Sequence, residues 1–429
     1  MNDATIHVVG AGVAGLSAAV RLADEGRRVV LHEAAGSAGG RCRSYQDQAL
    51  GLTIDNGNHL LLSGNWAALD YLDRIGSRAR LQGPSSAAFD FADLKSNERW
   101  RLRPNDGRTP WWLFDPSRRV PGAALHEYLA PLRTLRTTGT ASLSDVMKCS
   151  GPLYERLWGP VLLAGLNTDP AEGSALLAAA MLRETLFAGG KACRPLVAIG
   201  GLSACFVDPA LDHLYARGAT IRFGERLRGV AFADGRAVGL DFGEGRTEFG
   251  SHDELILAVP PFVARELLPE LHAPDEFRAI VNAHFRVEPA KDQPLILGVV
   301  NGLSQWIFSY PEHVSVTISG ADRLIDRPRE DLAEAIWGEV AAVHGLGSKP
   351  PPWRIIKEKR ATFAATPIQN AKRPPAHTRW ANVVLAGDWT QTGLPATIEG
   401  AVRSGYKAAS IVTERRDGAR VRKRAGVSR

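Results

Sequence analysis

Residues 8–22 read VVGAGVAGLSAAVRL, a strand-like run followed by a glycine-rich turn and a helix-like run. The turn has the pattern GxGxxG, whose glycines permit a tight turn and bring backbone N–H groups close to a pyrophosphate at the helix N-terminus. A dinucleotide-binding unit requires this pattern between a strand and a helix, which is where it stands. The cofactor-binding candidates in this turn are Gly10, Gly12, Val13, Ala14 and Gly15.

The residues that follow this turn favour FAD over NAD. Glu33 ends the second strand-like run, eighteen residues beyond Gly15, where a carboxylate can bond both hydroxyls of a ribose. Gly39 and Gly40 then bring Arg41 to the turn, and its guanidinium can neutralise a pyrophosphate with paired donors. A simple NAD domain has no need of such a group. Glu33, Gly40 and Arg41 are therefore predicted cofactor contacts. The alternatives are that the glycine-rich turn binds no ligand and that Arg41 is an ordinary surface cation.

A second turn of this kind lies far along the chain, in residues 386–405, AGDWTQTGLPATIEGAVRSG. Asp388 is placed to accept a hydrogen bond from a ribityl hydroxyl, and Pro395 favours the start of a helix. The positive end of that helix would face the flavin pyrimidine. Small residues at i, i+4 spacing along the helix predict close contact with the N-terminal helix or with the cofactor. The cofactor-binding candidates here are Gly387, Asp388, Thr397 and Ile398.

Alternating strands and helices appear three times in the chain, separated by two long insertions. We therefore predict an α/β fold with a Rossmann-like FAD-binding domain assembled from residues 1–64, 195–262 and 376–413. The insertions, 65–194 and 263–375, would form an inserted α+β substrate-binding domain, and the first of them reads as helices with proline breaks. Residues 414–429 are expected to be a basic, disordered tail.

Composition excludes several classes of protein. Of 429 residues, 45% are hydrophobic, yet no window approaches the ~20 apolar residues that cross a bilayer. The start of the chain shows no signal peptide and the four cysteines show no CxxC spacing, so we expect free thiols, no metal site and a cytoplasmic location. Residues 414–429 hold seven Arg or Lys and two acids, which is +5 of the net +6. The nearly neutral body argues against nucleic acid as a partner, and the tail is read as solvated, with anionic lipid as the alternative.

Further stretches carry a resemblance to a known family. Together with the two glycine-bearing turns, DNGNH (55–59) and LAVPP (257–261) are similar to the FAD-dependent amine oxidase and phytoene desaturase superfamily, over essentially the whole chain. Longer stretches, among them WWLFDP (111–116) and KRATFAATP (359–367), resemble the hydroxysqualene dehydroxylases of bacterial hopanoid synthesis. The resemblance implies FAD as cofactor, and the contacts that we add to the list are Gly57, Asn58, His59 and Val230.

The resemblance also implies reductive chemistry on an apolar C30 isoprenoid, the allylic alcohol hydroxysqualene. Loss of the hydroxyl as water would leave an allylic cation, and hydride from reduced flavin would convert it to squalene. The sequence contains no second GxGxxG, so electrons would reach the flavin from an unidentified carrier or from transiently bound NAD(P)H. Two alternatives stay open: an oxidative desaturase of a carotenoid-like polyene, and a flavin-free prenyl-binding protein of the same fold.

Departure of the hydroxyl requires a proton donor. The catalytic candidates are Asp55, His59 and Glu399, because their motifs place them near the flavin in proteins of this kind. Each has a non-catalytic alternative. Asp55 could orient a loop, His59 could bond the backbone or the flavin, and Glu399 could cap a helix or contact the cofactor.

An aromatic cluster in the first insertion has two interpretations. Trp111, Trp112 and Phe114 precede Arg118 and Arg119, and aromatic residues backed by cations are typical of an interfacial membrane anchor. Ordinary core packing is the favoured alternative, since tryptophan is highly buried on average. Peripheral membrane contact is therefore one of the partners that we consider.

Overall fold

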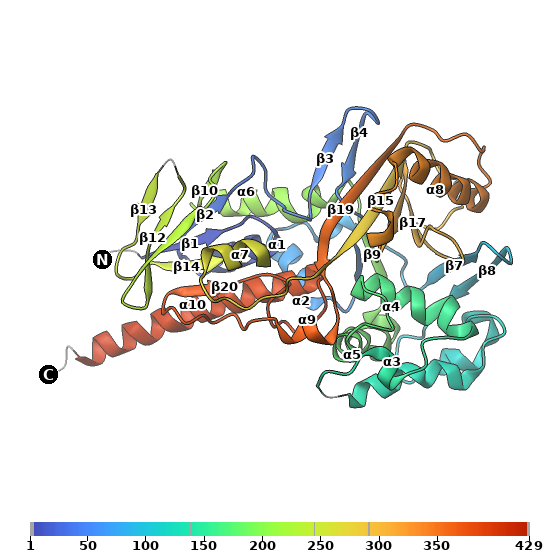
Figure 1. Cartoon of the computed structure of the whole chain (residues 1–429), viewed down its shortest axis with the longest axis horizontal. Coiled ribbons are helices and arrows are strands. Elements are labelled where there is room, and N and C mark those ends of the chain that lie inside the picture. Colours follow the sequence, from blue (N-terminus) through green and yellow to red (C-terminus); the bar gives the residue numbers. More distant parts are fainter. Residues whose placement is uncertain (1–3, 138, 244, 291, 427–429) are drawn as a thin grey trace.

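The computed structural model describes residues 4–426 except 138, 244 and 291, and it places two large sheets in the two halves of an elongated molecule (Figure 1). The first sheet is parallel and takes its five strands from three separated parts of the sequence. The predicted Rossmann-like α/β fold is confirmed, whereas the domain boundaries stay a prediction. In spatial order the strands are β10 (Thr220–Phe223), β2 (Arg28–Glu33), β1 (Thr5–Val9), β14 (Glu254–Leu257) and β20 (Val383–Leu385).

Helices α1 (Val13–Asp24) and α10 (Ile398–Gly426) pack against each other beside this sheet. Their close approach depends on Gly405, because a Cβ there would lie 2.2 Å from Ser17 Oγ and 2.3 Å from the carbonyl oxygen of Ala14. The small residues of α10 thus meet the N-terminal helix, one of the two predicted partners. The other helices of this half are α2 (Trp66–Arg74), α6 (Asp208–Ala216), α7 (Pro261–Leu267) and η8 (Ser203–Val207).

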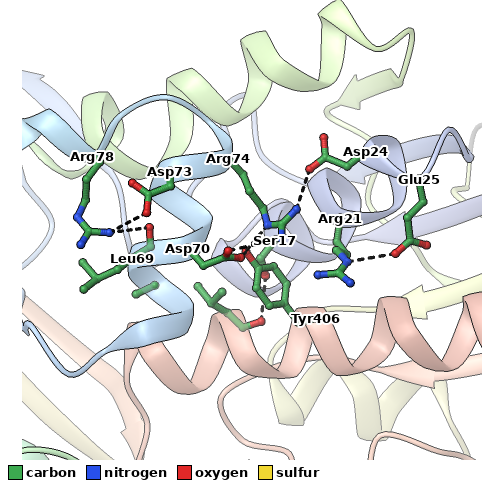
Figure 2. A network of polar contacts seen from close by, with 12 residues as sticks. Ser17, Arg21, Asp24, Glu25, Leu69, Asp70, Asp73, Arg74, Arg78 and Tyr406 are labelled. Atoms are coloured by element: carbon green, nitrogen blue, oxygen red, sulfur yellow. Dashed lines mark hydrogen bonds and ion pairs between the residues drawn. The ribbon is translucent and has the colours of Figure 1, made fainter.

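A polar network joins α10 to α1 and α2 (Figure 2). The Tyr406 hydroxyl of α10 donates to Asp70 of α2 at 2.8 Å. Asp70 also accepts from Arg74 Nε at 2.7 Å, and Arg74 reaches Asp24 of α1 at 3.3 Å. The three helices around the glycine turn are therefore linked by side chains as well as by packing.

Residues 414–426, expected to be a disordered tail, instead continue α10. Extending an existing helix orders only one further residue for each hydrogen bond gained, so it is easier than starting a new helix. Arg, Lys and Ala also favour the helical state. Arg415 also pairs with Glu254 of β14 at 3.4 Å, which fixes the side of the helix to the sheet. Residues 427–429 of the expected tail lie outside the described residues.

The second sheet mixes both insertions. Its first-insertion strands correct the expectation of helices with proline breaks, because β7 reads FDFAD and pairs antiparallel with β8 and in parallel with β16. Phe91 of β7 lies opposite Gly298, where a Cβ would come within 2.6 Å of the Phe91 ring. In spatial order the strands are β19 (Trp353–Phe363), β15 (Phe277–Phe285), β18 (Val314–Ile318), β17 (Trp306–Ser309), β16 (Ile296–Val300), β7 (Phe89–Asp93) and β8 (Glu98–Leu102).

Shorter elements connect the two halves or cover their faces. Helix α8 (Arg329–His344) packs on the second sheet and buries one side against it. No helix in the described part of the chain is apolar over a length that would span a membrane. The remaining strands are β3 (Ser44–Asp47) paired with β4 (Leu52–Asp55), the set β5 (Leu60–Leu62), β9 (Pro195–Ala198) and β6 (Leu81–Gln82), and the set β11 (Gly229–Ala233), β12 (Arg236–Asp241) and β13 (Arg246–Glu248). The remaining helical segments include η2 (Trp111–Phe114), η3 (Pro116–Arg118), η4 (Leu125–Arg136), α3 (Leu143–Val146), η5 (Tyr154–Trp158), α4 (Gly159–Leu166), α5 (Ala175–Glu184) and α9 (Pro367–Ala371).

A buried histidine pair joins two adjacent strands of the first sheet, β1 and β2. His7 Nδ1 lies 3.1 Å from His32 Nε2, and His32 Nδ1 lies 2.7 Å from Glu225 Oε2. The rings stack between Phe249 and Phe242, each 4.8 Å from its neighbouring imidazole. Burial lowers the pKa of both histidines, and that of His7 falls to about 4.

This pair predicts a loss of stability in mild acid. Because the folded state resists protonation of His7 until about pH 4, the unfolded chain binds more protons between pH 6.5 and 4, and the free energy of unfolding falls as pH falls through that window. For one such group the loss between pH 7 and pH 5 is about 2 kcal/mol. Urea unfolding at pH 7 and at pH 5 gives the difference in the free energy of unfolding between the two pH values. In His7→Gln this difference should be smaller than in the parent protein by a similar amount. An unchanged difference in the variant would contradict the assignment.

Candidate functional site

The glycine turn between β1 and α1 has one open position between two crowded ones. Gly10 has φ +105°, and a Cβ there would lie 2.4 Å from the carbonyl oxygen of Ala258. A Cβ on Gly15 would fall 1.9 Å from the carbonyl oxygen of Gly10. A Cβ on Gly12, in contrast, would meet no atom of the described residues within 4 Å. The crowded glycines bring strand and helix together, and Gly12 presents bare backbone to open space, as close approach of a pyrophosphate requires.

Backbone donors converge on this open position. Gly12 is the N-cap of α1 with no side chain capping the helix, and the amides of residues 13–15 lack helical acceptors by geometry. A second glycine turn lies alongside, because Gly39 N donates to the carbonyl of Ala11 at 2.8 Å and a Cβ on Gly40 would come within 3.4 Å of Gly12 Cα. The two turns together form a surface suited to an anion.

Glu33 is held beside the same turn. Its Oε2 accepts from Ala11 N and its Oε1 from Ala35 N, both at 2.8 Å. A carboxylate has about four lone-pair sites, so acceptor capacity is left for ribose hydroxyls. Val230 lies half-buried on β11, where it pairs with Leu240. Its contact with the cofactor stays a prediction.

Arg41 and Asp388 join the two ends of the chain. Arg41 Nη2 donates to both carboxylate oxygens of Asp388, at 2.8 and 2.7 Å, across 347 positions of sequence. The Asp388 charge is the main cause of a raised pKa for Arg41. The Asp388 side chain is 8% exposed and that of Arg41 45% exposed, and Arg41 Nη1 also donates to the carbonyl oxygen of Ala361. The groups predicted to bind the pyrophosphate and the ribityl chain thus lie in direct contact.

Arg373 is a residue of this site that the sequence did not reveal. Its guanidinium is buried and donates to three backbone carbonyls of the turn before α10, those of Asp388, Thr390 and Leu394, at 2.8 to 3.0 Å. It also bonds the side chains of Thr392 and Asn370. No spacing rule singles out an arginine in the segment AKRPP, which resembles a surface loop.

The start of α10 is fixed where the sequence predicted it. Thr397 Oγ1 accepts from Gly400 N at 3.0 Å and so caps the helix, and Ile398 is buried behind it. Gly387, with φ +154°, donates from its N–H to Ser404 Oγ at 2.8 Å. The cap directs the positive end of the helix toward the turn that carries Asp388.

Glu399 has a structural partner for each of its oxygens. It accepts from Ala67 N at 3.1 Å and from Ala68 N at 2.8 Å, which are the second and third amides of α2. Arg403 Nε donates to it at 2.7 Å. Glu399 therefore caps α2 from another helix, the non-catalytic alternative considered for it, and this geometry gives no support to a role as proton donor.

Asp55 is bonded through one of its two carboxylate oxygens. Its Oδ1 accepts from Ser44 Oγ at 2.5 Å and from Leu202 N at 2.8 Å, and burial raises its pKa. Ser44 in turn bonds Ser203 through both its amide and its hydroxyl, at 2.7 and 2.8 Å. Asp55 thereby locks the β3–β4 hairpin to the helical segment that begins near residue 202, which favours its interpretation as an orienting group.

His59 lies near Arg41 and Asp388. Burial, followed by the positive charge of Arg41, lowers its pKa to about 4, and the Asp388 charge opposes the shift. The imidazole is therefore neutral near pH 7 and suits hydrogen bonding better than donation of an imidazolium proton. Among the described residues it has no hydrogen-bond partner, so both ring nitrogens are available to a ligand.

Gly57 and Asn58 attach this segment to the second sheet. Asn58 Nδ2 donates to Ser315 Oγ at 2.7 Å and to Thr317 Oγ1 at 3.0 Å. A Cβ on Gly57 would lie 2.9 Å from Asn282 Nδ2. The structure thus assigns Asn58 a bridging contact between the halves, and its predicted cofactor contact stays a prediction.

The residues present fit FAD. The open glycine supplies room for a pyrophosphate, Glu33 supplies acceptors for a ribose, and Asp388, which pairs with Arg41, supplies a carboxylate for a ribityl hydroxyl. The Arg41 side chain is 45% exposed. A dinucleotide with groups to satisfy at both ends matches this arrangement better than a mononucleotide does.

Comparison with known proteins agrees with this geometry. The family described as flavin-containing amine oxidoreductase matches residues 13–413. Hydroxysqualene dehydroxylases of Rhodopseudomonas palustris and Sinorhizobium fredii are 55% and 52% identical to the chain, each over 95% of it and over 98% and 97% of the relative. The structure of cyclohexylamine oxidase from Brevibacterium oxydans superposes with a TM-score of 0.70 at 16% identity, covering 97% of this chain and 100% of that one, which shows the shared fold. The chain is therefore an FAD-dependent oxidoreductase of the flavin-containing amine oxidoreductase family and belongs, within it, with the hydroxysqualene dehydroxylases.

Proposed function

We propose that the chain converts hydroxysqualene to squalene by reductive removal of the hydroxyl group. The allylic C–O bond breaks, the hydroxyl leaves with a proton as water, and a hydride forms the new C–H bond. Reduced FAD, when bound, supplies that hydride, and an external donor supplies two electrons per turnover. The observation that carries the proposal is the Arg41–Asp388 contact beside an open glycine turn, in a chain 55% identical to a hydroxysqualene dehydroxylase.

The residues of the chain would bind and orient rather than form covalent bonds. The amides of residues 13–15 and Arg41 would hold the pyrophosphate, Glu33 a ribose, and Asp388 a ribityl hydroxyl. For His59 we propose a hydrogen bond from its neutral ring to the flavin or to the leaving oxygen. Asp55 and Glu399 would act on structure, because Asp55 Oδ1 and both oxygens of Glu399 are already bonded within the protein.

The partners and the location belong to the same proposal. The substrate would be an apolar C30 isoprenoid held among segments of the two insertions, and the electron donor is a separate molecule. We place the protein in the cytoplasm, in contact with a membrane that holds such a substrate. Support for the substrate class comes from the names of the relatives.

Anaerobic incubation with hydroxysqualene and dithionite, followed by product mass, tests the reaction. The expected product has lost one oxygen and gained no unsaturation. In D₂O it should carry one deuterium at the carbon that held the hydroxyl, because the transferable hydrogen of reduced flavin exchanges with solvent. Dithionite without protein is the control and should leave the substrate unchanged.

Two results would contradict the proposal. Loss of two hydrogens with oxidised flavin would indicate the oxidative desaturase considered above. A preparation that binds the isoprenoid but releases no flavin on denaturation would indicate the flavin-free binding protein.

A further inference from the structure

Five large apolar side chains stand exposed in one stretch of the first insertion. Trp111 is 67% exposed and Phe114 69%, and their rings lie 6.2 Å apart on η2. Three leucines of η4 are 40–50% exposed. Together these residues, defined here as the apolar patch, are Trp111, Phe114, Leu125, Leu129 and Leu132.

The apolar patch stands on a packed base. Trp112, next to Trp111, points inward, and its ring meets that of Tyr128 edge-on at 5.5 Å. Tyr128 is buried on η4, and its hydroxyl accepts from Val120 N at 2.8 Å. This contact packs η2 against η4, the two segments that carry the exposed residues. The interpretation of the tryptophans as core residues thus holds for Trp112 but not for Trp111.

The surroundings of the apolar patch are positively charged. Residues 101–136 contain seven arginines and three acids, in a chain whose body is nearly neutral. Two of the acids are already bonded: Asp115 accepts from Ser117, and Glu127 accepts from Ala124 N. The exposed arginines of this stretch include Arg103, Arg108, Arg133 and Arg136.

We propose that the apolar patch and its arginines dock the protein onto an anionic lipid bilayer. Aromatic and leucine side chains gain by leaving water for the acyl boundary, and guanidinium groups gain from lipid phosphates at the same depth. The positive charge favours lipid over a second copy of the chain, in which like charges would face each other. The basic end of α10 lies at the opposite end of the molecule from residues 111–136, so it is not part of this surface (Figure 1).

Docking at this place would give an apolar substrate a route that avoids bulk water. That consequence rests on the proposed function, whereas the docking itself rests on exposure and charge. The test therefore measures binding to lipid in the absence of any substrate, and a failure of the dehydroxylation assay would leave its outcome intact.

Flotation of the full chain with vesicles provides the test. The protein should float with vesicles of phosphatidylglycerol and phosphatidylcholine, less with phosphatidylcholine alone, and less at high salt. The double substitution Trp111→Ser with Phe114→Ser should lower the partition coefficient by ~10-fold or more, because binding scales with buried apolar area. The matched control is Ile368→Ser with Tyr215→Ser, which removes two side chains that are 70% and 54% exposed outside the patch, and it should float like the parent protein.

Three results would overturn the proposal. The parent protein could stay at the bottom of the gradient with both vesicle types. The double variant could float as well as the parent protein while keeping its fold by circular dichroism. The parent protein could also be a dimer that the double variant converts to monomer, which would make the apolar patch an interface between copies.

Discussion

Replacement of Gly12 by valine is expected to give a folded protein without flavin. The turn leaves open space around Gly12, and its φ of −74° is accessible to any residue, so the side chain fits the protein. The penalty for losing a glycine N-cap is about 1 kcal/mol at most. The same side chain would occupy the space that the pyrophosphate needs, so the affinity for FAD should fall roughly 100-fold or more, equivalent to about 3 kcal/mol.

Flavin absorbance after purification and titration of the apoprotein with FAD measure this effect. Thermal unfolding adds a second measure, because FAD should raise the midpoint of the parent protein and not that of the variant. Gly338→Val on α8 is the matched control, since a Cβ there also meets no atom of the described residues within 4 Å. Gly15→Val should prevent folding and not only flavin binding, because its Cβ collides with the carbonyl of Gly10. A Gly12→Val protein that retains FAD with unchanged affinity would contradict the site.

The N-terminal part of the first sheet was predictable because its determinants are local. Strand β1, the glycine turn, α1 and Glu33 lie within thirty consecutive residues, and each carries its own pattern of apolar residues or glycines. Strand β7 was not predictable in this way. Its sequence FDFAD carries two acids. It pairs locally with β8, but its place in the seven-stranded sheet depends on pairing with β16, more than two hundred positions later. Long-range pairing of this kind leaves little trace in a single sequence.

The site shows the same division. Arg41 and Asp388 each stand in a recognisable motif, but their mutual contact follows only from the closure of the two chain ends. Glu399 has the chemistry of a proton donor, and its actual partners, the first amides of α2, are more than three hundred positions away. The residue types in the sequence therefore identified the polar residues that lie in the site. The structure was needed to show which of these residues are already bonded within the protein and which are free to bind a ligand.

Arg373 is expected to be worth more to stability than any other single polar side chain of this site. It is 2% exposed, burial lowers its pKa to about 10, and its charge is met mainly by carbonyl oxygens. In Arg373→Ala the carbonyls of the turn before α10 would lose their donor inside the protein, and an unsatisfied buried group costs about 1–3 kcal/mol. For three carbonyls with partial relaxation we expect a loss of roughly 3–5 kcal/mol in the free energy of unfolding.

Urea unfolding of Arg373→Ala and Arg373→Lys separates packing from hydrogen bonding. Lysine keeps the charge but offers three donors from a single point, so it should recover only part of the loss. Lys372→Ala is the control, since its exposed pair with Asp275 should contribute about 1 kcal/mol or less. Because the turn that Arg373 holds also carries Asp388, the alanine variant should bind FAD more weakly as well as unfold more easily. A variant that loses stability and binds FAD like the parent protein would show that the turn reaches its geometry without the guanidinium, and Asp388 would then owe its position to Arg41 alone.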